Sequence, residues 1–434
     1  MNRGSGAALY KRHRRLKSLS VTMVAYKLAR AFLRFHNGIL RKQMTPRSRL
    51  IIFFASIPVV VFTLIGGYLG RVSAGEDTYR HLRIFEDVVS LISNNYVEEV
   101  ELESVIQGAL RGLAEGLDAD SAYLSREDVT RIESGQPLPE GNVGLTVTRR
   151  YYIQAVAADD GSPAARAGIL PGDFIRAIDG EPTRFMSAVE GQRRLHGEPG
   201  SSVSLSLVRG STQEPYDIEL TREQTGDSSV SGHILDAGGI GYVRIPEFSE
   251  NAVEQLSGTV ESLADSGAEH LIIDIRNTAR GNYEASIDAA RLFISTGTLV
   301  IRKEQGDRET PLEAASAGSV ISTPLTLLLN FGSSGPAEVF AAALTETQRA
   351  STVGQRTSGR AGRQKLIRLP DGTGLWVTFV RYLKASGEAI HLSGVEPEVP
   401  VEVEQPELGE PLPAEDRILE KAVEQIEESL AATA

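Results

Sequence analysis

The side chains most able to perform nucleophilic catalysis lie between residues 330 and 365. Ser333 and Ser334 come just before a predicted helix, and Lys365 follows Gln364 on a predicted strand. A serine nucleophile needs a base within hydrogen-bond distance, and lysine can be that base only as the neutral amine. A serine before a helix is ordinarily a turn or cap residue, and alternation along the strand points Lys365 away from the face of Gln364. A dyad built from these residues is therefore an alternative and not our main interpretation.

The composition excludes several classes of catalytic and metal site. The chain has no cysteine, which excludes disulfides, thiol catalysis and zinc–thiolate sites. Its seven histidines are scattered without the spacing of metal ligands. We therefore expect no metal and no cofactor. At 434 residues the chain can hold two or three domains, each with its own core, and its ordinary apolar and charged content argues against wholesale disorder.

Two segments around the serines carry a recognisable pattern. Residues 330–338 read Asn-Phe-Gly-Ser-Ser-Gly-Pro-Ala-Glu, and residues 354–362 read Gly-Gln-Arg-Thr-Ser-Gly-Arg-Ala-Gly. They resemble the motifs of the carboxyl-terminal processing (tail-specific) serine peptidases. The first family motif runs roughly Gly-Ser-Ala-Ser-Ala-Ser-Glu, with the middle serine as nucleophile, and the second runs Thr-Phe-Gly-Lys-Gly, with the lysine as general base. Glu338, Thr357, Gly359 and the unchanged spacing fix the register of the resemblance.

In this register, both catalytic positions carry residues that cannot do the chemistry. Gly335 stands at the nucleophile position and Arg360, 25 residues later, at the base position. Glycine has no side chain, and arginine keeps its proton because its pKa lies above about 12. Gln364 matches the glutamine that orients the catalytic lysine in the family. The resemblance therefore implies that no catalytic dyad is intact.

The oxyanion-binding groups of the family are altered as well. The backbone N–H after the nucleophile is a natural oxyanion donor, and Pro336 has no N–H. The family's Arg-Asn-Asn-Pro-Gly-Gly loop, which also helps to bind the oxyanion, corresponds to Arg-Asn-Thr-Ala-Arg-Gly at residues 276–281. Arg280 replaces its first glycine and puts a bulky side chain where close backbone approach was possible, whereas Gly281 is retained.

Three functions remain open on this pattern. The main interpretation is a pseudopeptidase that acts as an adaptor, scaffold or regulator, for example of an active homologous peptidase. The second is a working tail-specific endopeptidase with rearranged groups, using Ser333 or Ser334. The third is a structural protein of the cell envelope. Arg280 and Arg360 with Gln364 could also bind an anion such as a peptide carboxylate, or the two arginines could be solvated or pair with neighbouring acids.

Residues 140–226 are predicted to form a PDZ domain. The run Ser-Pro-Ala-Ala-Arg-Ala-Gly-Ile-Leu-Pro-Gly-Asp at residues 162–173 resembles the PDZ run Ser-Pro-Ala-x-x-Ala-Gly-Leu-x-x-Gly-Asp. Ser162 should cap a short helix that Gly168 ends. Backbone N–H groups of a glycine loop can hold a peptide carboxylate while the next strand pairs with the peptide backbone. The residues expected to bind peptide are Val143, Gly144, Leu145, Thr146 and Val147.

The predicted groove defines the expected partners. Residues 186–195 should form the helix that flanks it, and its ligands would be protein C-terminal tails or unfolded peptides. The alternative is that these residues only build a small β-rich fold whose groove is unused. A homo-oligomer is also possible.

Residues 71–139 are expected to be mainly helical, on the apolar spacing of residues 82–92 and 102–117. Asn-Tyr-Val-Glu at residues 95–98 and Leu-Asp-Ala-Asp-Ser-Ala-Tyr-Leu at residues 117–124 resemble the family's Asn-Tyr-Val-Asp and Leu-Asp-Pro-His-Ser-Ser-Tyr-Leu. These segments precede the PDZ domain in the family, as they do here.

Residues 227–410 alternate strand and helix patterns and are expected to form a βα-rich core like that of the tail-specific proteases. Ser249 should cap a helix that reaches about residue 266, and residues 271–275 form a continuous apolar strand. Residues 411–434 should end the chain as an amphipathic helix. The predicted fold class is therefore α/β and multidomain, with an N-terminal transmembrane helix before the helical segment.

That transmembrane helix is predicted from residues 50–70, an uncharged and mostly apolar run of about bilayer length. Residues 1–49 hold many Lys and Arg and no Asp or Glu, although the whole chain has a net charge of −12. Such a flank places the N-terminus in the cytoplasm and the bulk of the chain in the periplasm or outside the cell. The alternative is a signal peptide cleaved after Ala74. Because the span explains the basic arm, we expect a lipid bilayer and not nucleic acid as its partner.

Overall fold

The structure, a computed structural model, describes residues 81–210, 214–224, 228–235, 239–314 and 320–433. The predicted basic segment and transmembrane helix, residues 1–49 and 50–70, lie outside these residues. Within the described ranges, no helix combines the length and apolarity needed to cross a bilayer. The chain divides after Leu102 into two units, which are described separately. In the first, residues 81–95 are helical.

The predicted PDZ domain is a small antiparallel β domain with two short helices. Its main sheet has the strand order β3-β4-β5-β8-β9, and β6 pairs with β5. These strands are β3 (Leu145–Arg150), β4 (Tyr152–Ala158), β5 (Phe174–Ile178), β6 (Glu181–Pro182), β8 (Ser202–Val208) and β9 (Tyr216–Thr221). A smaller sheet has the order β10-β2-β7, from β2 (Gly141–Asn142), β7 (His196–Gly197) and β10 (Glu223–Gln224).

The short helix of this domain begins and ends at the residues that the sequence predicts. The Ser162 hydroxyl accepts a hydrogen bond from the Ala165 N–H and caps α5 (Pro163–Arg166). Gly168 follows that helix with a φ of 74°, a conformation that favours glycine. The helix α6 (Ala188–Leu195) flanks β3, and the 3₁₀ turn η1 (Thr183–Phe185) precedes it.

The core domain is built on a mostly parallel six-stranded sheet. The order is β11-β12-β13-β16-β17-β20, with only β11 antiparallel to its neighbour. The strands are β11 (Ser231–Ile234), β12 (Ile240–Arg244), β13 (His270–Asp274), β16 (Leu325–Leu329), β17 (Ser351–Gly354) and β20 (Val399–Pro400). Since parallel strands end at the same edge, the loops after β12, β13, β16 and β17 meet there.

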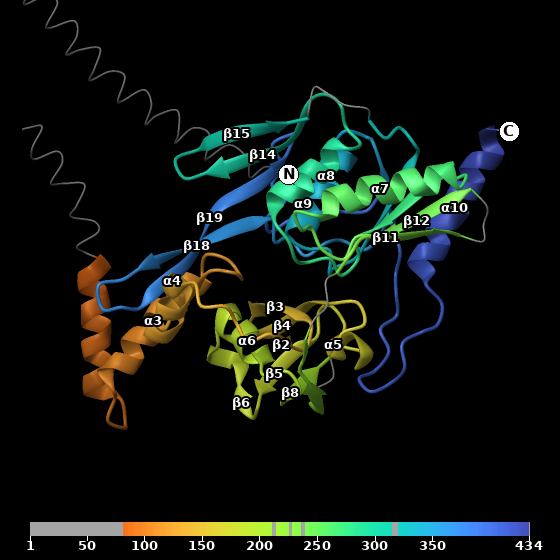
Figure 1. Cartoon of the computed structure of the whole chain (residues 1–434). Coiled ribbons are helices and arrows are strands. Elements are labelled where there is room, and N and C mark those ends of the chain that lie inside the picture. Colours follow the sequence, from red (N-terminus) through yellow and green to blue (C-terminus); the bar gives the residue numbers. More distant parts are fainter. Residues whose placement is uncertain (1–80, 211–213, 225–227, 236–238, 315–319, 434) are drawn as a thin grey trace, which may run out of the picture. The chain divides into compact units, whose positions relative to one another are not determined.

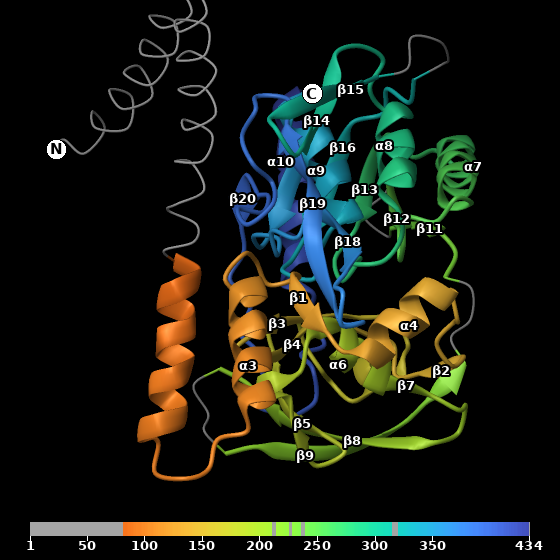
Figure 2. The ribbon, with the colours of Figure 1, turned by 90° about the vertical axis from the view of Figure 1, so that its left-hand side faces the viewer.

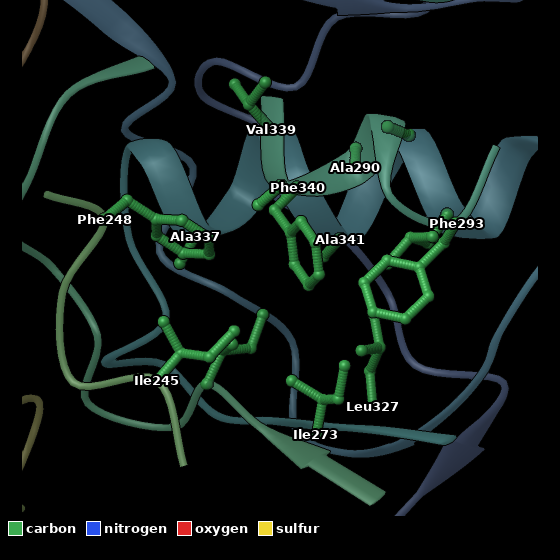
Figure 3. Packing of buried hydrophobic residues seen from close by; sticks show 14 of the residues in the cluster. Ile245, Phe248, Ile273, Ala290, Phe293, Leu327, Ala337, Val339, Phe340 and Ala341 are labelled. Carbon is green, nitrogen blue, oxygen red and sulfur yellow. The ribbon is translucent and has the colours of Figure 1, made fainter. Parts of the chain in front are cut away.

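Helices cover both faces of this sheet. One face packs against α7 (Ala252–Asp265), α8 (Tyr283–Arg291) and α9 (Pro336–Glu346), and the other against α10 (Arg417–Thr433) (Figure 1). Alternate residues of β16 divide between the faces: Leu327 joins the first cluster and Leu328 the second. Figure 3 shows Phe340 of α9 packed between Phe248 and Phe293, above Ile273 and Leu327 of the sheet.

A second sheet joins the segment before the PDZ domain to the core. Its order is β1-β19-β14-β15, with β18 also paired to β19 (Figure 2). The strands are β1 (Ala122–Leu124), β14 (Thr298–Glu304), β15 (Arg308–Glu313), β18 (Gly362–Arg368) and β19 (Gly374–Lys384). The helices α3 (Leu102–Glu115) and α4 (Arg126–Ser134) lie on either side of β1 in the chain.

Within the segment 71–139, residues 81–95, Leu102–Glu115 and Arg126–Ser134 are helical, and residues 122–124 pair with β19 as a strand. One local expectation needs correction. Ser249 does not cap α7, whose N-cap is Asn251 without a side-chain hydrogen bond. The hairpin β14–β15 turns at Gly306 and Asp307, both with positive φ.

Candidate functional site

The turn between β16 and α9 holds Gly335 in a conformation that few other residues adopt. Its φ is 58° and its ψ is −110°. Positive φ costs an L-residue about 1–3 kcal/mol because its Cβ crowds the backbone. A sharp, strained strand-to-helix turn is also how the α/β-hydrolases expose their nucleophile. A Cβ at residue 335 would lie 3.4 Å from the Tyr283 hydroxyl, an ordinary contact, so the position has room for a side chain and only the backbone opposes it.

Glu338 joins the two predicted motifs. Its buried carboxylate accepts hydrogen bonds from the Thr357 hydroxyl (2.6 Å) and from the backbone N–H groups of Gly359 (2.6 Å), Arg360 (2.7 Å) and Gly335 (2.9 Å). Burial raises the pKa of this carboxyl above its ordinary value, although the four donors act in the opposite direction. One carboxylate therefore holds the nucleophile position beside the base position, as the register of the motifs requires.

Arg360, at the base position, forms a partly buried ion pair with Asp120. Its Nη2 lies 2.8 Å from Asp120 Oδ1, and its Nε lies 3.0 and 3.1 Å from the two carboxylate oxygens. Desolvation alone would lower the pKa of Arg360, but the Asp120 charge and its hydrogen bonds raise it above the ordinary value. The Thr148 hydroxyl of β3 donates to the same carboxylate at 3.0 Å. Arg360 is thus fixed as a cation and cannot accept a proton.

Asp120 occupies the place of the histidine in the family wording Leu-Asp-Pro-His-Ser-Ser-Tyr-Leu. In the register of the resemblance, Arg360 stands where the family has lysine and Asp120 where it has histidine. A guanidinium and a carboxylate form a well-matched pair of hydrogen bonds, and Arg360 and Asp120 form such a pair here.

The predicted positions of the degenerate catalytic site, except Arg280, line one cavity of about 360 Å³. Its lining includes Gly281, Gly335, Pro336, Arg360, Gln364 and Thr146 of the predicted peptide strand. The Gln364 side chain donates to the Gly362 carbonyl and the Thr378 hydroxyl, both at 3.2 Å, and so serves hydrogen bonding within the sheet. Arg363 in the same wall is paired with Glu284 at 2.8 Å.

Arg280 and Gly281 have separate roles. Gly281 has a φ of 113°, and a Cβ there would come within 2.3 Å of the Phe248 carbonyl oxygen, so only glycine fits. Arg280 turns toward Asp159 (3.1 Å) and Glu247 (3.3 Å) and is not among the residues that line the cavity. Burial raises the pKa of Asp159, against the effect of the Arg280 charge. The arrangement favours paired arginines over the alternative of an anion site.

The alternative serines do not meet a base. Ser333 is fully buried, and its hydroxyl donates to the Ile275 carbonyl at 2.8 Å. The Ser334 hydroxyl accepts from the Ser358 hydroxyl at 2.9 Å. Lys365 is exposed on β18, where its ammonium lies 5.2 Å from the centre of the Phe379 ring. This geometry gives neither serine a general base.

Tyr283, which the motifs do not single out, forms the floor beside Gly335. Its hydroxyl donates to the Gly362 carbonyl (2.9 Å) and the Arg360 carbonyl (3.2 Å), and its ring stacks on Tyr382. Burial raises its pKa well above the ordinary range, so the hydroxyl is neither a base nor an anionic nucleophile at neutral pH. Sequence reasoning missed Asp120 and Tyr283 because their partners are distant in sequence. The one available signal was the family wording, in which a histidine corresponds to Asp120.

The predicted peptide-binding residues are brought together on one edge strand and its preceding loop. Gly144 has a φ of 66°, and a Cβ there would come within 2.2 Å of the Ser162 Cβ. Val143, Leu145 and Val147 are buried, and Thr146 is half-buried. The β3 strand pairs with β4 on one side and faces α6 on the other. This is the arrangement that strand addition by a peptide requires.

Comparisons with known proteins agree with this architecture. Residues 239–401 match the description Peptidase family S41, and residues 154–209 match PDZ domain. A carboxyl-terminal-processing protease of Synechocystis sp. is 29% identical over 79% of this chain and 87% of its own length. The carboxy-terminal processing protease CtpA of Bacillus subtilis is 28% identical over 72% of this chain and 67% of its own length.

A solved structure gives the same result. The photosystem II D1 C-terminal processing protease aligns with 73% of this chain and 92% of its own, with a TM-score of 0.62 and 25% identity. The α/β core and the PDZ domain are therefore those of a shared fold.

Proposed function

Because the chain belongs to the family of carboxyl-terminal processing proteases and carries its PDZ domain, we propose that it is a pseudopeptidase that binds protein C-terminal tails or unfolded segments without cleaving them. It would act as an adaptor or regulator, for example of an active homologous peptidase.

The observation that carries this proposal is the ion pair between Arg360 and Asp120. Replacement of the serine alone would remove the nucleophile but leave the general base in place. Here the base position is a permanently charged arginine held by a buried carboxylate at 2.8 Å. Pro336 also removes a backbone donor for the oxyanion, and Gly335 removes the nucleophile. The nucleophile, the base and the oxyanion donor are therefore all affected, while Glu338 still holds the scaffold together.

The proposal is tested by incubating the purified full-length chain with casein and with a tailed peptide, and searching for products by mass spectrometry. We expect intact substrates after long incubation, and no labelling of the protein by serine-directed inhibitors. An active carboxyl-terminal processing protease serves as the positive control. Cleavage that is lost in Ser333→Ala or Ser334→Ala would overturn the proposal in favour of an active endopeptidase.

We also propose that the chain is a single-pass protein of the cytoplasmic membrane, with its N-terminus in the cytoplasm and the bulk of the chain in the periplasm or outside the cell. The support is the apolar run of residues 50–70 behind a basic flank. In that position the PDZ domain would meet envelope or exported proteins.

A further inference from the structure

A side chain of the same domain already forms hydrogen bonds with the edge of β3, the predicted peptide strand, that does not pair with β4. The Gln192 side chain of α6 donates its Nε2 to the Leu145 carbonyl at 2.9 Å and accepts from the Val147 N–H at 3.2 Å. These two backbone groups lie on the side of β3 that faces away from β4. They are the groups that a peptide adding to this edge would use.

The Gln192 amide reproduces the chemistry of a peptide bond. A primary amide offers one carbonyl acceptor and N–H donors, as a backbone peptide unit does. It therefore satisfies both edge groups at once, which leaves neither of them an unpaired polar group in a buried site. Leu145 and Val147 are each only 4% exposed.

The loop that would hold the peptide carboxylate shows the same feature. The Gly144 N–H, one of the candidate carboxylate donors, donates to the Asn142 side-chain oxygen at 2.6 Å. The carbonyl of the Gly144 residue accepts from the Asp159 N–H at 2.8 Å, so it is engaged as well. An amide oxygen thus stands where a carboxylate oxygen of a bound tail would be expected.

We propose that Gln192 is an internal cap of the PDZ groove, which an extended peptide must displace in order to bind. The inference rests on the proposed peptide-binding function. The ligand class it assigns is an extended polypeptide segment with a free C-terminal carboxylate, which replaces the Gln192 amide on β3 and the Asn142 oxygen in the loop. Since the cap competes through two backbone hydrogen bonds that any peptide can make, it sets a threshold for affinity without selecting a sequence.

The competing interpretation is that Gln192 is a ligand contact that turns outward to hold a bound peptide. The two interpretations predict opposite effects of removing the side chain. Loss of a competitor tightens binding, whereas loss of a contact weakens it.

The experiment measures binding of a pool of unstructured decapeptides, with an apolar last residue and a free carboxylate, to the full-length chain by isothermal titration. We compare the natural protein with Gln192→Ala and with Gln192→Met, which keeps the side-chain length but not the amide. Two lost hydrogen bonds predict about tenfold tighter binding in both variants. Gln255→Ala is the matched control, because Gln255 also bonds a backbone N–H, that of Val230, but on α7. It should leave the affinity unchanged.

Hydrogen exchange gives a second readout that needs no ligand. The Val147 amide should exchange about tenfold faster in both Gln192 variants, and peptide should restore its protection. Saturable binding that is unchanged or weaker in both variants would overturn the cap and leave the proposed function standing. Absence of binding in every form of the protein would overturn both.

Discussion

Gly335 adopts a backbone conformation at the strand-to-helix turn that favours glycine. A φ of 58° is strained for any residue with a Cβ. In active enzymes such strained residues are found where the side chain takes part in the mechanism. In this chain a glycine stands there, and glycine adopts the same turn without that strain. Glycine is therefore the residue that makes this turn locally most stable.

The substitution Gly335→Ala should lower the stability of the protein by about 1–3 kcal/mol. The Tyr283 hydroxyl lies at an ordinary contact distance from the new Cβ, so the cost comes from the backbone and not from a clash. Urea unfolding of the full chain measures it. Gly108→Ala is the control, because Gly108 lies inside α3 with no atom near its Cβ position and should gain about 0.5–1 kcal/mol. Equal effects at the two glycines would contradict the assignment of strain.

The double substitution Gly335→Ser and Arg360→Lys should not restore proteolysis. A lysine at residue 360 would meet the Asp120 carboxylate that now binds the guanidinium, and a nearby negative charge keeps an ammonium protonated. A protonated lysine cannot accept the serine proton. Pro336 would still offer no N–H to the oxyanion.

The measurement is cleavage of casein and of a tailed peptide over a range of pH, with the single variants as controls. Turnover by the double variant at neutral pH would show that Asp120 does not hold the base position in its charged form. Turnover by Gly335→Ser alone would show that the rest of the site is intact.

Short elements determine where the residues of the site lie. The turn before β1 presents Asp120 to Arg360, and Asp118 holds that turn by accepting from the N–H groups of Asp120 (3.1 Å) and Ser121 (2.7 Å). Burial alone would raise the pKa of Asp118, but His391 and the hydrogen bonds around Ser121 hold it well below its ordinary value of 3.8. The ionised carboxylate is therefore the form that the folded chain stabilises.

The pH dependence of Asp118→Asn follows from this direction. A folded-state pKa below the unfolded one means that the carboxylate adds stability above pH 3.8, and that this stability is lost as the pH falls toward the folded value. Asp118→Asn should therefore cost about 1–3 kcal/mol at neutral pH and progressively less in acid. Urea titrations at neutral and acidic pH measure the difference. Asp265→Asn, on the exposed end of α7, should change little at either pH, and a constant deficit for Asp118→Asn would refute the role of its charge.

Elements of this kind were predictable where the signal is local. The continuous apolar run at residues 271–275 predicts a strand, and β13 covers His270–Asp274. The proline after Gly335 marks the start of α9. The pairing of Asp120 with Arg360 spans 240 residues, and that of Gln192 with Leu145 spans 47. No periodicity or cap encodes such pairs, because they depend on the tertiary packing of separate elements. The motif alignment brought the site positions together, but it could not show what Arg360 would bind.

At the scale of the whole molecule, the N-terminal segment is basic and the rest of the chain is acidic. Residues 1–49 hold 13 Lys and Arg and no acid, so the residues after 49 carry a net charge of −25 and the whole chain −12. A basic flank before an apolar run orients a helix across the cytoplasmic membrane and keeps the flank inside. A peptide-binding domain anchored in this way would sample exported proteins close to the membrane surface.

The anchoring proposal predicts that the full-length chain sediments with membranes and resists extraction by high salt and alkaline carbonate. Arginine at both Val60 and Phe62 should release it, because each charge near the centre of a spanning helix costs about 3 kcal/mol. Ser18→Arg with Ser20→Arg adds the same charge to the basic flank and should leave the protein in the membrane. Cleavage after Ala74 would instead give a mature chain that begins at Gly75 and is released by carbonate, and N-terminal sequencing distinguishes the two. That product would replace a permanent anchor with a signal peptide, because the hydrophobic segment would then direct export without holding the PDZ domain at the bilayer.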